Sequence, residues 1–584
     1  MGKTTGDAVI ERLIEWGVKH IFGLPGDGCN GLFEALRKNQ DKIQFIQVRH
    51  EEGAAFAACA YAKFTGKLGV CIATSGPGAI HLLNGLYDAK MDSQPVLALT
   101  GQALHDLLGQ RYQQEVNLTM LYSDVAAYNE TILTGHQAEA LIDLACRTAL
   151  SRKTVSHITI PADIQEADVK EGGKSQKFVK GHTSDAWIPP VRIPPKEDLQ
   201  KAADVINSGK KTVILAGQGA LGAREELEQL AQLVGGPIVK PLLGKATVPD
   251  GSPYTTGGIG LLGTLPSELA MEECDSLIMV GTSFPYLHFY PKPGKARAVQ
   301  IDMDPTRLGL RYPVEIGLAG DSKATLQALM GLIKRRPDQS FLKQAQERMK
   351  DWWELMDERG RREDMPMKPE VVAYCLNDLL KDDAIVCTDS GTITTWIARQ
   401  MIVRGNQMFS CSGNLATMAP GLPYAVGAQT AFPGRQVVAF VGDGGFTMLM
   451  GEFVTAVKYN LPIKVVIIKN NTLGQIKWEQ MVFLGNPEFG VELQPIDFVK
   501  FAEACGGKGF FCDNPKEMRT TLDAALRHPG PCIVEAVVDA NEPPMPAKVK
   551  PRQAVHMAEA LLKGERHGAE IVKSIFGDKI RELV

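Results

Sequence analysis

The 584-residue chain lacks the large basic excess that binding to a phosphate backbone requires. Its 63 lysines and arginines are outnumbered by 67 aspartates and glutamates, which gives a formal net charge of −4. Nucleic-acid binding as the main activity is therefore not expected. Hydrophobic residues make up 44% and charged residues 22% of the chain, which is the composition of an ordinary folded protein and not of a disordered segment or a membrane bundle.

The sequence also lacks paired cysteines, a secretory signal and an unbroken apolar run. Its 11 cysteines include no C-x-x-C pair, and the closest two are Cys505 and Cys512. This pattern is typical of reduced intracellular thiols and predicts neither a disulfide framework nor a zinc site. The amino terminus shows no apolar signal core, so we expect a cytoplasmic location. The uncharged stretches 68–87 and 405–434 contain Gly, Pro and polar residues, and neither favours a membrane-spanning helix.

What the chain does contain is a series of short apolar runs that alternate with helical stretches. Such runs, for example 276–280 and 464–468, are typical of strands buried in parallel sheets with helices on both faces. The sequence therefore predicts an α/β protein, and at about 150 residues per domain it allows three or four domains. The expected organisation is an N-terminal unit (1–168), a linker (169–194), a central unit (195–335), a connector (336–364), a third unit (365–545) and a C-terminal tail (546–584).

The third unit places polar residues after two expected strands. The strand at 437–441 runs into Gly442-Asp443-Gly444-Gly445, and the strand at 464–468 is followed by Asn470. Because open α/β sheets bind ligands at the carboxyl ends of their strands, Asp443 and Asn470 are expected at the same edge. Glycines, hard oxygen ligands and a helix start suit a diphosphate bound through a divalent cation. Alone, each segment is more typical of a plain turn or loop, but the pair favours a binding site.

The first unit carries a carboxylate at an expected helix start. Glu51 stands after an expected strand and before a run of small helix-forming residues, so its side chain is expected to point out from the rim of a sheet. The alternative is a helix-start carboxylate that is stabilised only by the helix macrodipole. Two glycine-containing turns accompany it, at Gly23-Leu-Pro-Gly26-Asp27 and Gly76-Pro-Gly78.

With these segments in order, the chain resembles the thiamine-diphosphate-dependent family that includes pyruvate oxidases and acetohydroxyacid synthases, over residues 1–545. The resemblance implies three doubly wound parallel-sheet domains of the pyruvate oxidase type, namely pyrimidine-binding, central flavin-type and diphosphate-binding domains. It also implies an active site shared between two subunits of a dimer or tetramer, so a monomer is expected to be inactive. The matching motifs are Arg49-His50-Glu51, Gly76-Pro-Gly78, Gly413-Asn-Leu-Ala-Thr-Met418 and Gly442-Asp443-Gly444 with Asn470.

The resemblance implies a role for each matching residue. Glu51 would hydrogen-bond the aminopyrimidine ring of thiamine diphosphate and so favour loss of the thiazolium proton. Asp443, Asn470 and the Thr472 carbonyl would hold Mg²⁺. Met418 would wedge beneath the cofactor, although core packing is an alternative role for a methionine. Further cofactor contacts are implied for Gly26, Gly391, Ala416, Gly442, Gly444 and Gly445.

The central unit raises the question of a second cofactor. Its Gly217-x-Gly219-x-x-Gly222 matches a dinucleotide turn, but Lys240 stands near the position where a nicotinamide ribose would need an acid. This argues against an NAD dehydrogenase. The resemblance to pyruvate oxidases instead implies FAD, although relatives with this fold also hold ADP or no ligand. The implied FAD contacts are Gly217, Gly219, Gly263, Thr282, Ser283, Phe284, Asp302 and Asp321.

Glu479 separates two reactions within the family. Acetohydroxyacid synthases usually have Trp there and pyruvate oxidases usually have Glu, so we favour oxidative decarboxylation of pyruvate or a similar 2-oxo acid, as in pyruvate oxidase or pyruvate dehydrogenase (quinone). Gln113, Ser390 and Gln475 are polar where pyruvate oxidases are usually apolar. Because buried amides need hydrogen-bond partners, a more polar substrate is expected, unless waters or neighbouring side chains satisfy them. The candidate catalytic set is Glu51, Gln113, Gln114, Ser390, Gln475 and Glu479.

Three further alternatives stay open. The tail has apolar residues at helical spacing from Ile571 to Phe576, so it is expected to dock on the protein, cover the active site, or rest on the inner face of the membrane to reach a quinone. A carboligase would keep FAD without redox turnover or lack it. A silent scaffold would bind partners without turnover, but Glu51, Asp443 and Asn470 are all intact, which argues against it.

Overall fold

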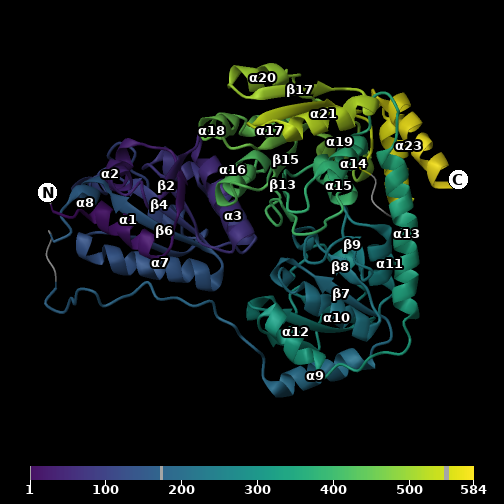
Figure 1. The fold of residues 1–584 in the computed structure, drawn as a ribbon, viewed down its shortest axis with the longest axis horizontal. Helices are drawn as coiled ribbons and strands as arrows, with labels where there is room; N and C mark the ends of the chain where they lie inside the picture. Colours follow the sequence, from purple (N-terminus) through teal and green to yellow (C-terminus); the bar gives the residue numbers. More distant parts are fainter. Residues whose placement is uncertain (1, 171–174, 545–550, 584) are drawn as a thin grey trace.

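The structure is a computed structural model that describes residues 2–170, 175–544 and 551–583, with side chains through residue 575. Within this part of the chain, three six-stranded sheets are present and all of their strand pairs are parallel. Helices cover both faces of the sheets, so the predicted fold class is confirmed. Figure 1 shows the N-terminal domain on the left, the third domain at the upper right and the central domain below it. The predicted domain boundaries stay a prediction.

The N-terminal sheet has the strand order β2-β1-β3-β4-β6-β5. Its four inner strands are buried between two hydrophobic clusters, one under α1, α2 and α7 and the other under α3 and α5, whereas the edge strands β2 and β5 are partly exposed. The strands are β1 (His20–Gly23), β2 (Gln44–Gln47), β3 (Gly69–Ala73), β4 (Val96–Gln102), β5 (Ala126–Thr131) and β6 (Val155–Pro161). The helices are α1 (Thr5–Glu15), α2 (Asn30–Lys38), α3 (Glu51–Thr65), α4 (Pro77–His81), α5 (Leu83–Met91), α6 (Leu118–Leu121), α7 (Ala138–Arg152) and α8 (Ala162–Glu166).

The central sheet has the strand order β12-β11-β10-β7-β8-β9 and is reached through a long segment that Figure 1 shows passing beneath the N-terminal domain. Its strands are β7 (Thr212–Ala216), β8 (Ile238–Lys240), β9 (Thr255–Gly258), β10 (Ser276–Val280), β11 (Arg297–Asp302) and β12 (Ile316–Ala319). Its helices are α9 (Lys196–Ser208), α10 (Arg224–Val234), α11 (Leu265–Glu273) and α12 (Ser322–Met330). Helix α13 (Ser340–Gly360) then runs from the central domain to the third (Figure 1).

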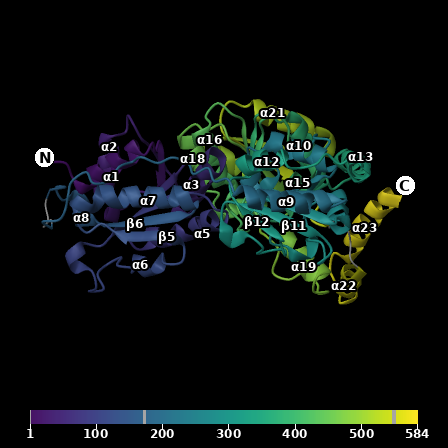
Figure 2. The same ribbon diagram turned by 90° about the horizontal axis from the view of Figure 1, so that it is seen from below.

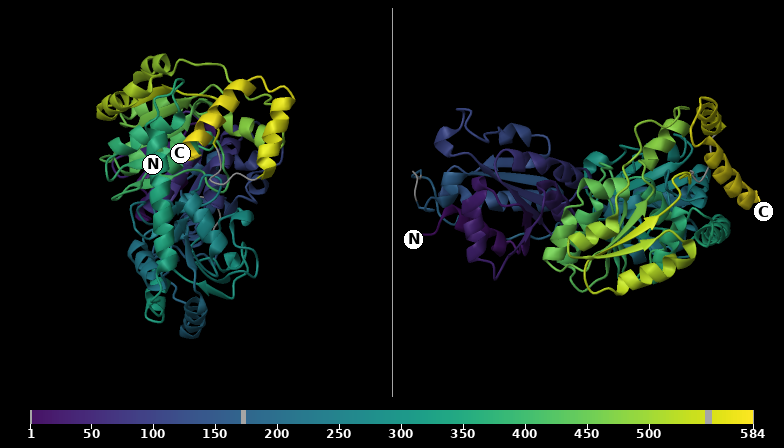
Figure 3. Two further views of the ribbon diagram at one scale, coloured as in Figure 1. Left: turned by 90° about the vertical axis from the view of Figure 1, so that its right-hand side faces the viewer. Right: turned by 90° about the horizontal axis from the view of Figure 1, so that it is seen from above.

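The third sheet has the order β14-β13-β15-β16-β18-β17 and the same doubly wound construction, visible from above in the right panel of Figure 3. Its strands are β13 (Ile385–Thr388), β14 (Met408–Ser410), β15 (Val437–Gly442), β16 (Lys464–Lys469), β17 (Lys508–Cys512) and β18 (Cys532–Val537). Its helices are α14 (Pro369–Leu379), α15 (Thr392–Gln400), α16 (Gly421–Ala431), α17 (Asp443–Met448), α18 (Glu452–Lys458), α19 (Gly474–Val482), α20 (Phe498–Ala504) and α21 (Pro515–Arg527).

The N-terminal and third domains share one hydrophobic core. Buried residues of α3 and α16 belong to a single cluster that extends from the N-terminal sheet into the third sheet. The two helices approach closely because α3 is rich in alanine and α16 carries Gly427, where a Cβ atom would overlap the backbone of Ala57. This contact fixes the N-terminal domain against the third domain.

The tail forms α22 (Pro551–Leu562) and α23 (Gly568–Leu583), which lie on the outer side of the third domain (Figure 3, left). Ile571 is fully buried and joins Met557 and Ala560 in a cluster with Trp478 and Met481 of α19. Figure 2 shows α19 and α22 next to each other. The described tail therefore docks on the protein, whereas the side chain of Phe576 lies outside the described residues. None of the described helices is both long and apolar enough to cross a membrane.

Candidate active site

The carboxyl edge of the third sheet brings Asp443 and Asn470 together. Strands β15 and β16 pair so that Gly442 lies opposite Ile468; Asp443 directly follows β15, and Asn470 directly follows β16. The backbone N–H groups of Gly444 and Asn471 donate to the two oxygens of Asp443, at 2.9 and 2.6 Å. Carboxylate and amide oxygens of this kind are the ligands that Mg²⁺ takes in proteins. The edge can therefore hold a hard divalent cation.

Burial and close packing give this edge its electrostatic character. Burial raises the pKa of Asp443 to about 6, although hydrogen bonds from the backbone of Asn471 and Gly444 oppose the shift. A cation beside Asp443 would favour its charged form. A Cβ atom at Gly445 would overlap the carboxylate of Asp389, and one at Gly444 would lie 2.9 Å from the Leu473 side chain. A side chain at Gly445 would displace the Asp389 carboxylate, whereas only the tip of the Leu473 side chain would have to shift for one at Gly444.

A cavity of about 2290 Å³ lies between the three domains, and the Asp443 edge forms part of its wall. It joins the strand ends of the third domain to those of the central domain. Among the residues expected at cofactors or substrate, it is lined by Gly217, Gly219, Thr282, Ser283, Phe284, Asp302, Asp321, Ser390, Gly391, Ala416, Met418, Gly442, Asp443, Gly444, Gly445, Asn470, Thr472, Gln475 and Glu479.

Helix α19 presents two polar side chains to this cavity. Gln475 and Glu479 lie one turn apart, and the Gln475 amide donates to the Glu479 carboxylate at 3.0 Å. The opposite side of the helix carries Trp478 and Met481, which are buried against the tail. The tail thus holds the helix from behind and leaves its polar side turned toward the cavity.

The loop that carries Ala416 and Met418 has a strained backbone. Ala416 and Ala419 have φ values of 53° and 86°, in the left-handed region that alanine rarely adopts. Such conformations persist only where surrounding contacts determine them. Met418 is half-buried at the cavity wall, so it is not an ordinary core methionine.

The central domain contributes glycines and an acid to the same cavity. A Cβ atom at Gly217 would lie 2.5 Å from the Gly281 carbonyl oxygen, and one at Gly219 would lie 2.8 Å from the Gly281 Cα. Contact between two strand-end turns therefore explains these glycines without a ligand. Asp302 is largely buried in the cavity wall, and burial raises its pKa. The set of donors and acceptors fits a nucleotide, but the glycine pattern itself does not require one.

Three expected FAD contacts have other roles in the fold. Gly263 does not line the cavity, and a Cβ atom there would lie 2.6 Å from the Gly258 carbonyl oxygen, so this glycine is required by a tight turn. Asp321 lines the cavity but also caps α12, because its carboxylate accepts the backbone N–H of Ala324 at 2.9 Å. Thr282 likewise accepts the backbone N–H of Phe284 at 3.2 Å.

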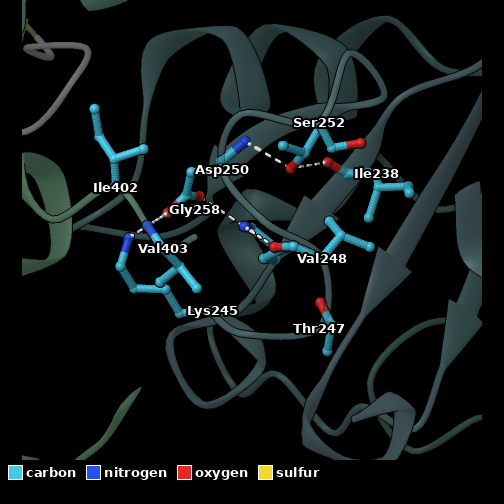
Figure 4. A network of polar contacts seen from close by, with 12 residues as sticks. Ile238, Lys245, Thr247, Val248, Asp250, Ser252, Gly258, Ile402 and Val403 are labelled. Atoms are coloured by element: carbon cyan, nitrogen blue, oxygen red, sulfur yellow. Dashed lines mark hydrogen bonds and ion pairs between the residues drawn. The ribbon is translucent and has the colours of Figure 1, made fainter. Parts of the chain in front are cut away.

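A buried ion cluster fixes the wall between the central and third domains (Figure 4). The Asp250 carboxylate accepts hydrogen bonds from the ammonium groups of Lys240 at 2.6 Å and Lys245 at 3.1 Å. It also accepts the backbone N–H of Val403 at 2.8 Å. Burial lowers the pKa of Lys240, and Asp250 partly offsets the shift. Lys240 thus pairs inside the domain, which accounts for a lysine where a nicotinamide-binding fold would carry an acid.

The residues expected around Glu51 form a separate group. Glu51 begins α3, and its carboxylate lies 2.9 Å from His81 Nδ1. In the same region, the Ser75 hydroxyl donates to the Gln114 side chain at 2.8 Å. A Cβ atom at Gly26 would lie 2.5 Å from the Thr74 side chain. None of Gly26, Glu51, Gln113 and Gln114 is among the cavity's described lining residues, and Gln113 is exposed.

The structure adds two residues to the Glu51 group. His81 follows the Gly76-Pro-Gly78 turn within a few positions, and that proximity is a signal the sequence did offer. Glu452 comes from the third domain, and its carboxylate accepts the backbone N–H groups of Arg49 and His50 at 2.9 and 3.0 Å. No sequence pattern links Glu452 to Glu51, because they are brought together only by domain packing.

Comparison with known proteins identifies the family. Three family descriptions match the chain: the N-terminal TPP binding domain of thiamine pyrophosphate enzymes at residues 3–121, their central domain at 199–329 and their C-terminal TPP binding domain at 389–536. The chain belongs to the thiamine pyrophosphate enzyme family. The predicted family is thereby confirmed, with thiamine diphosphate (the same compound as thiamine pyrophosphate) as its cofactor.

Relatives within this family carry different activities. The chain is 43% identical to the thiamine pyrophosphate-containing protein YdaP of Bacillus subtilis, with 96% of each chain covered. It is 32% identical to the pyruvate oxidase of Lactiplantibacillus plantarum, which covers 93% of this chain and 90% of that protein. It is 30% identical to the acetolactate synthase of Mycobacterium bovis, with 92% and 88% covered. These relatives show a thiamine-diphosphate-dependent enzyme and leave its reaction to be proposed.

We expect the buried Asp389 to make the stability of the folded protein depend on pH. Burial raises its pKa to about 7, against hydrogen bonds from the Ser390 and Ala419 backbone, and its Oδ2 atom has no hydrogen-bond partner among the described residues. From about pH 4, near the ordinary aspartate pKa, to about pH 7 the unfolded chain has lost this proton and the folded chain has kept it. Stability without cofactors should therefore fall as pH rises through this window.

We expect Asp389→Asn to reduce that fall, because the amide does not titrate. The measurement is the denaturant midpoint of the cofactor-free protein at several pH values across the window. Asp513→Asn, at an exposed aspartate, is the matched control and should keep the parent's pH dependence. An Asp389→Asn curve parallel to that of the parent would contradict the assignment.

Proposed function

We propose that this enzyme catalyses the thiamine-diphosphate- and FAD-dependent oxidative decarboxylation of pyruvate or a similar 2-oxo acid. The observation that carries the proposal is the single cavity that joins the Asp443 edge to the strand ends of the central domain. Two cofactors that exchange electrons must lie close to each other, and this cavity offers room for both. Glu479 on its wall and the similarity to a pyruvate oxidase support the same reaction.

The chain's own residues would divide the work as follows. Asp443, Asn470 and Thr472 would hold Mg²⁺, and Gly442, Gly444 and Gly445 would adjoin the diphosphate. The bound thiamine diphosphate supplies a carbon nucleophile and FAD accepts electrons. Glu51 would hold a proton at the pyrimidine ring, with His81 fixing the orientation of its carboxylate. Ser390, Gln475 and Glu479 would orient the substrate from the cavity wall.

We further propose that the enzyme acts as a dimer or a tetramer. Within one chain the Glu51 group and the Asp443 group occupy different places, and Glu51 does not line the cavity. A second copy that brings its Glu51, Gln113 and Gln114 to this cavity would complete the site. The docked tail supports a role in holding α19 in preference to resting on a membrane, since Ile571 is already buried against the protein.

A second candidate is a carboligase that acts on a more polar 2-oxo acid or aldehyde. The polar side chains of Ser390 and Gln475 at the cavity support it, as does the similarity to an acetolactate synthase. In that reaction FAD would be absent or would not change its redox state. The two candidates differ in whether a bound flavin is reduced by substrate.

Flavin reduction tests the oxidase proposal directly. We expect purified protein with thiamine diphosphate, Mg²⁺ and pyruvate, kept free of oxygen, to bleach the absorbance of its bound flavin. Glu51→Gln should still bind thiamine diphosphate but bleach about 10²- to 10⁴-fold more slowly, as is typical when an acid–base group is lost. Flavin that stays oxidised while carbon dioxide is released would favour the carboligase. Wild-type turnover in Glu51→Gln would contradict the role of Glu51.

Removing the central metal ligand should abolish cofactor binding. Asp443→Ala leaves the diphosphate charge without a cation, so the Kd for thiamine diphosphate with Mg²⁺ should rise by more than the about 10- to 100-fold typical of a lost outer-shell partner. Isothermal titration measures it, and Asp523→Ala on the surface of α21 is the control. An unchanged Kd in Asp443→Ala would reject the diphosphate site.

Substrate selection should depend on the polar residues. Gln113→Phe combined with Gln475→Phe should lower turnover of hydroxylated 2-oxo acids or aldehydes and leave that of pyruvate equal or higher. A site built to hydrogen-bond its substrate loses more when a partner is removed than an apolar pocket gains from a methylene, which is worth about 1–3 kcal/mol. The ratio of kcat/KM values for the two substrate classes is the readout. Equal ratios in parent and variant would show that these amides do not select the substrate.

A further inference from the structure

Asp92 lies at a junction of all three domains. It follows α5 in the N-terminal domain and is fully buried. Its carboxylate accepts the backbone N–H groups of Gly413 and Asn414, both at 2.8 Å, and the ammonium of Lys63 at 2.6 Å. Its backbone carbonyl accepts the side-chain amide of Gln218, from the central domain, at 2.9 Å. One residue thus contacts α3, the loop before Met418 and the turn after β7.

The loop held by Asp92 is the strained one. The loop consists of residues 411–418 and ends at Met418. Within it Ala416, and directly after it Ala419, have left-handed backbones. Two more hydrogen bonds join the N-terminal domain to this loop. Lys63 donates to the Cys411 carbonyl at 2.6 Å, and the Asn84 amide donates to the Thr417 hydroxyl at 3.1 Å. Strain of this kind needs external contacts to persist, and these contacts come from another domain of the same chain.

The charges at the junction are consistent with a fixed ion pair. Burial alone would raise the pKa of Asp92, but Lys63 and the donated N–H groups outweigh burial, so its pKa is lowered. The Lys63 side chain is 4% exposed and lies over the Tyr424 ring at 4.9 Å. Charge-assisted hydrogen bonds in such a buried setting are strong and directional.

We propose that Asp92, together with Lys63, is a positioning residue for thiamine diphosphate that holds the 411–418 loop in the shape that presents Ala416 and Met418 to the cofactor. The inference rests on the proposed role of that loop in cofactor binding. It makes each active site dependent on the N-terminal domain of its own chain for the loop, separately from any Glu51 that a second copy brings.

The test compares two buried aspartates of the N-terminal domain. Asp92→Asn removes the negative charge of the Asp92 carboxylate and leaves Lys63 in place. Asp143→Asn is the matched control, because Asp143 is also fully buried and is held by Arg12 at 2.6 Å and Trp16 at 2.7 Å, within its own domain. Asn84→Ala, which keeps the Asp92–Lys63 ion pair but also removes the hydrogen bond from the Asn84 amide to Glu52 at 2.7 Å, is a second junction variant in case Asp92→Asn fails to fold.

Hydrogen exchange on cofactor-free protein measures directly how well the backbone N–H groups of the loop are protected. We expect the N–H groups of Gly413 and Asn414 to exchange about 10- to 100-fold faster in Asp92→Asn, as the loss of charged hydrogen bonds predicts. Asn84→Ala should speed exchange in the same loop by less. Exchange in the loop should be unchanged in Asp143→Asn, even though that variant also loses stability.

Cofactor binding supplies the second readout. The Kd for thiamine diphosphate with Mg²⁺ should rise by about 10- to 100-fold in Asp92→Asn, the range typical of lost outer-shell partners, and should stay at the parent value in Asp143→Asn. The near-ultraviolet circular dichroism of the bound aminopyrimidine should change only in the junction variants. Equal Kd values in Asp92→Asn and parent, or an equal rise in Asp143→Asn, would overturn the proposal.

The exchange data separate this inference from the proposed function. If the parent protein bound no thiamine diphosphate, the proposed function would fail, and with it the role of the loop at a cofactor. If the parent bound it and loop exchange did not respond to Asp92→Asn, the junction alone would be rejected. Faster exchange together with weaker binding confined to the junction variants would support both.

Discussion

The close backbone contact between α3 and α16 is the constraint on which the rest of the structure depends. Helix α3 is almost completely buried, and glycines allow three neighbours to reach its backbone: Gly69 of β3, Gly85 of α5 and Gly427 of α16. A side chain at Gly427 would push the N-terminal and third domains apart, and one at Gly69 or Gly85 would displace α3 within the N-terminal domain. Since Glu51 begins this helix and Lys63 lies in its last turn, the same packing sets the place of the Glu51 group and of the 411–418 loop.

The sequence was most informative where the physics is local. Strands such as β10 and β16 are continuous apolar runs, because parallel strands are buried on both faces, and such runs can be recognised without tertiary information. Asp443 and Asn470 could also be placed at one edge, since each directly follows such a strand. Tertiary contacts could not be predicted from the sequence. Glu452 and Asp92 accept hydrogen bonds from segments hundreds of positions away, and only domain packing brings these groups together.

Local pattern was least reliable in the central domain. The Gly217 to Gly222 motif suggests a nucleotide turn, yet Gly217 and Gly219 are required by the neighbouring Gly281 turn. Lys240 stands where a nicotinamide-binding fold would need an acid, so the sequence did argue against an NAD site. Its partner Asp250 could not be inferred, because a buried ion pair leaves no periodicity in the sequence. A glycine in the sequence indicates that another group lies close to the backbone, but it does not indicate whether that group belongs to a ligand or to the protein.

The position of the cavity between domains has a consequence for how the protein folds. Each sheet is built from strands of its own segment, so its strands can pair before the domains dock, although the core shared by α3 and α16 is completed only on docking. The cavity wall takes residues from all three domains and therefore exists only after they dock. Domain docking is slower than formation of local structure. The binding surface thus forms only when the domains dock, after the strands of each sheet have paired, and it is present only in molecules whose three domains have all docked correctly.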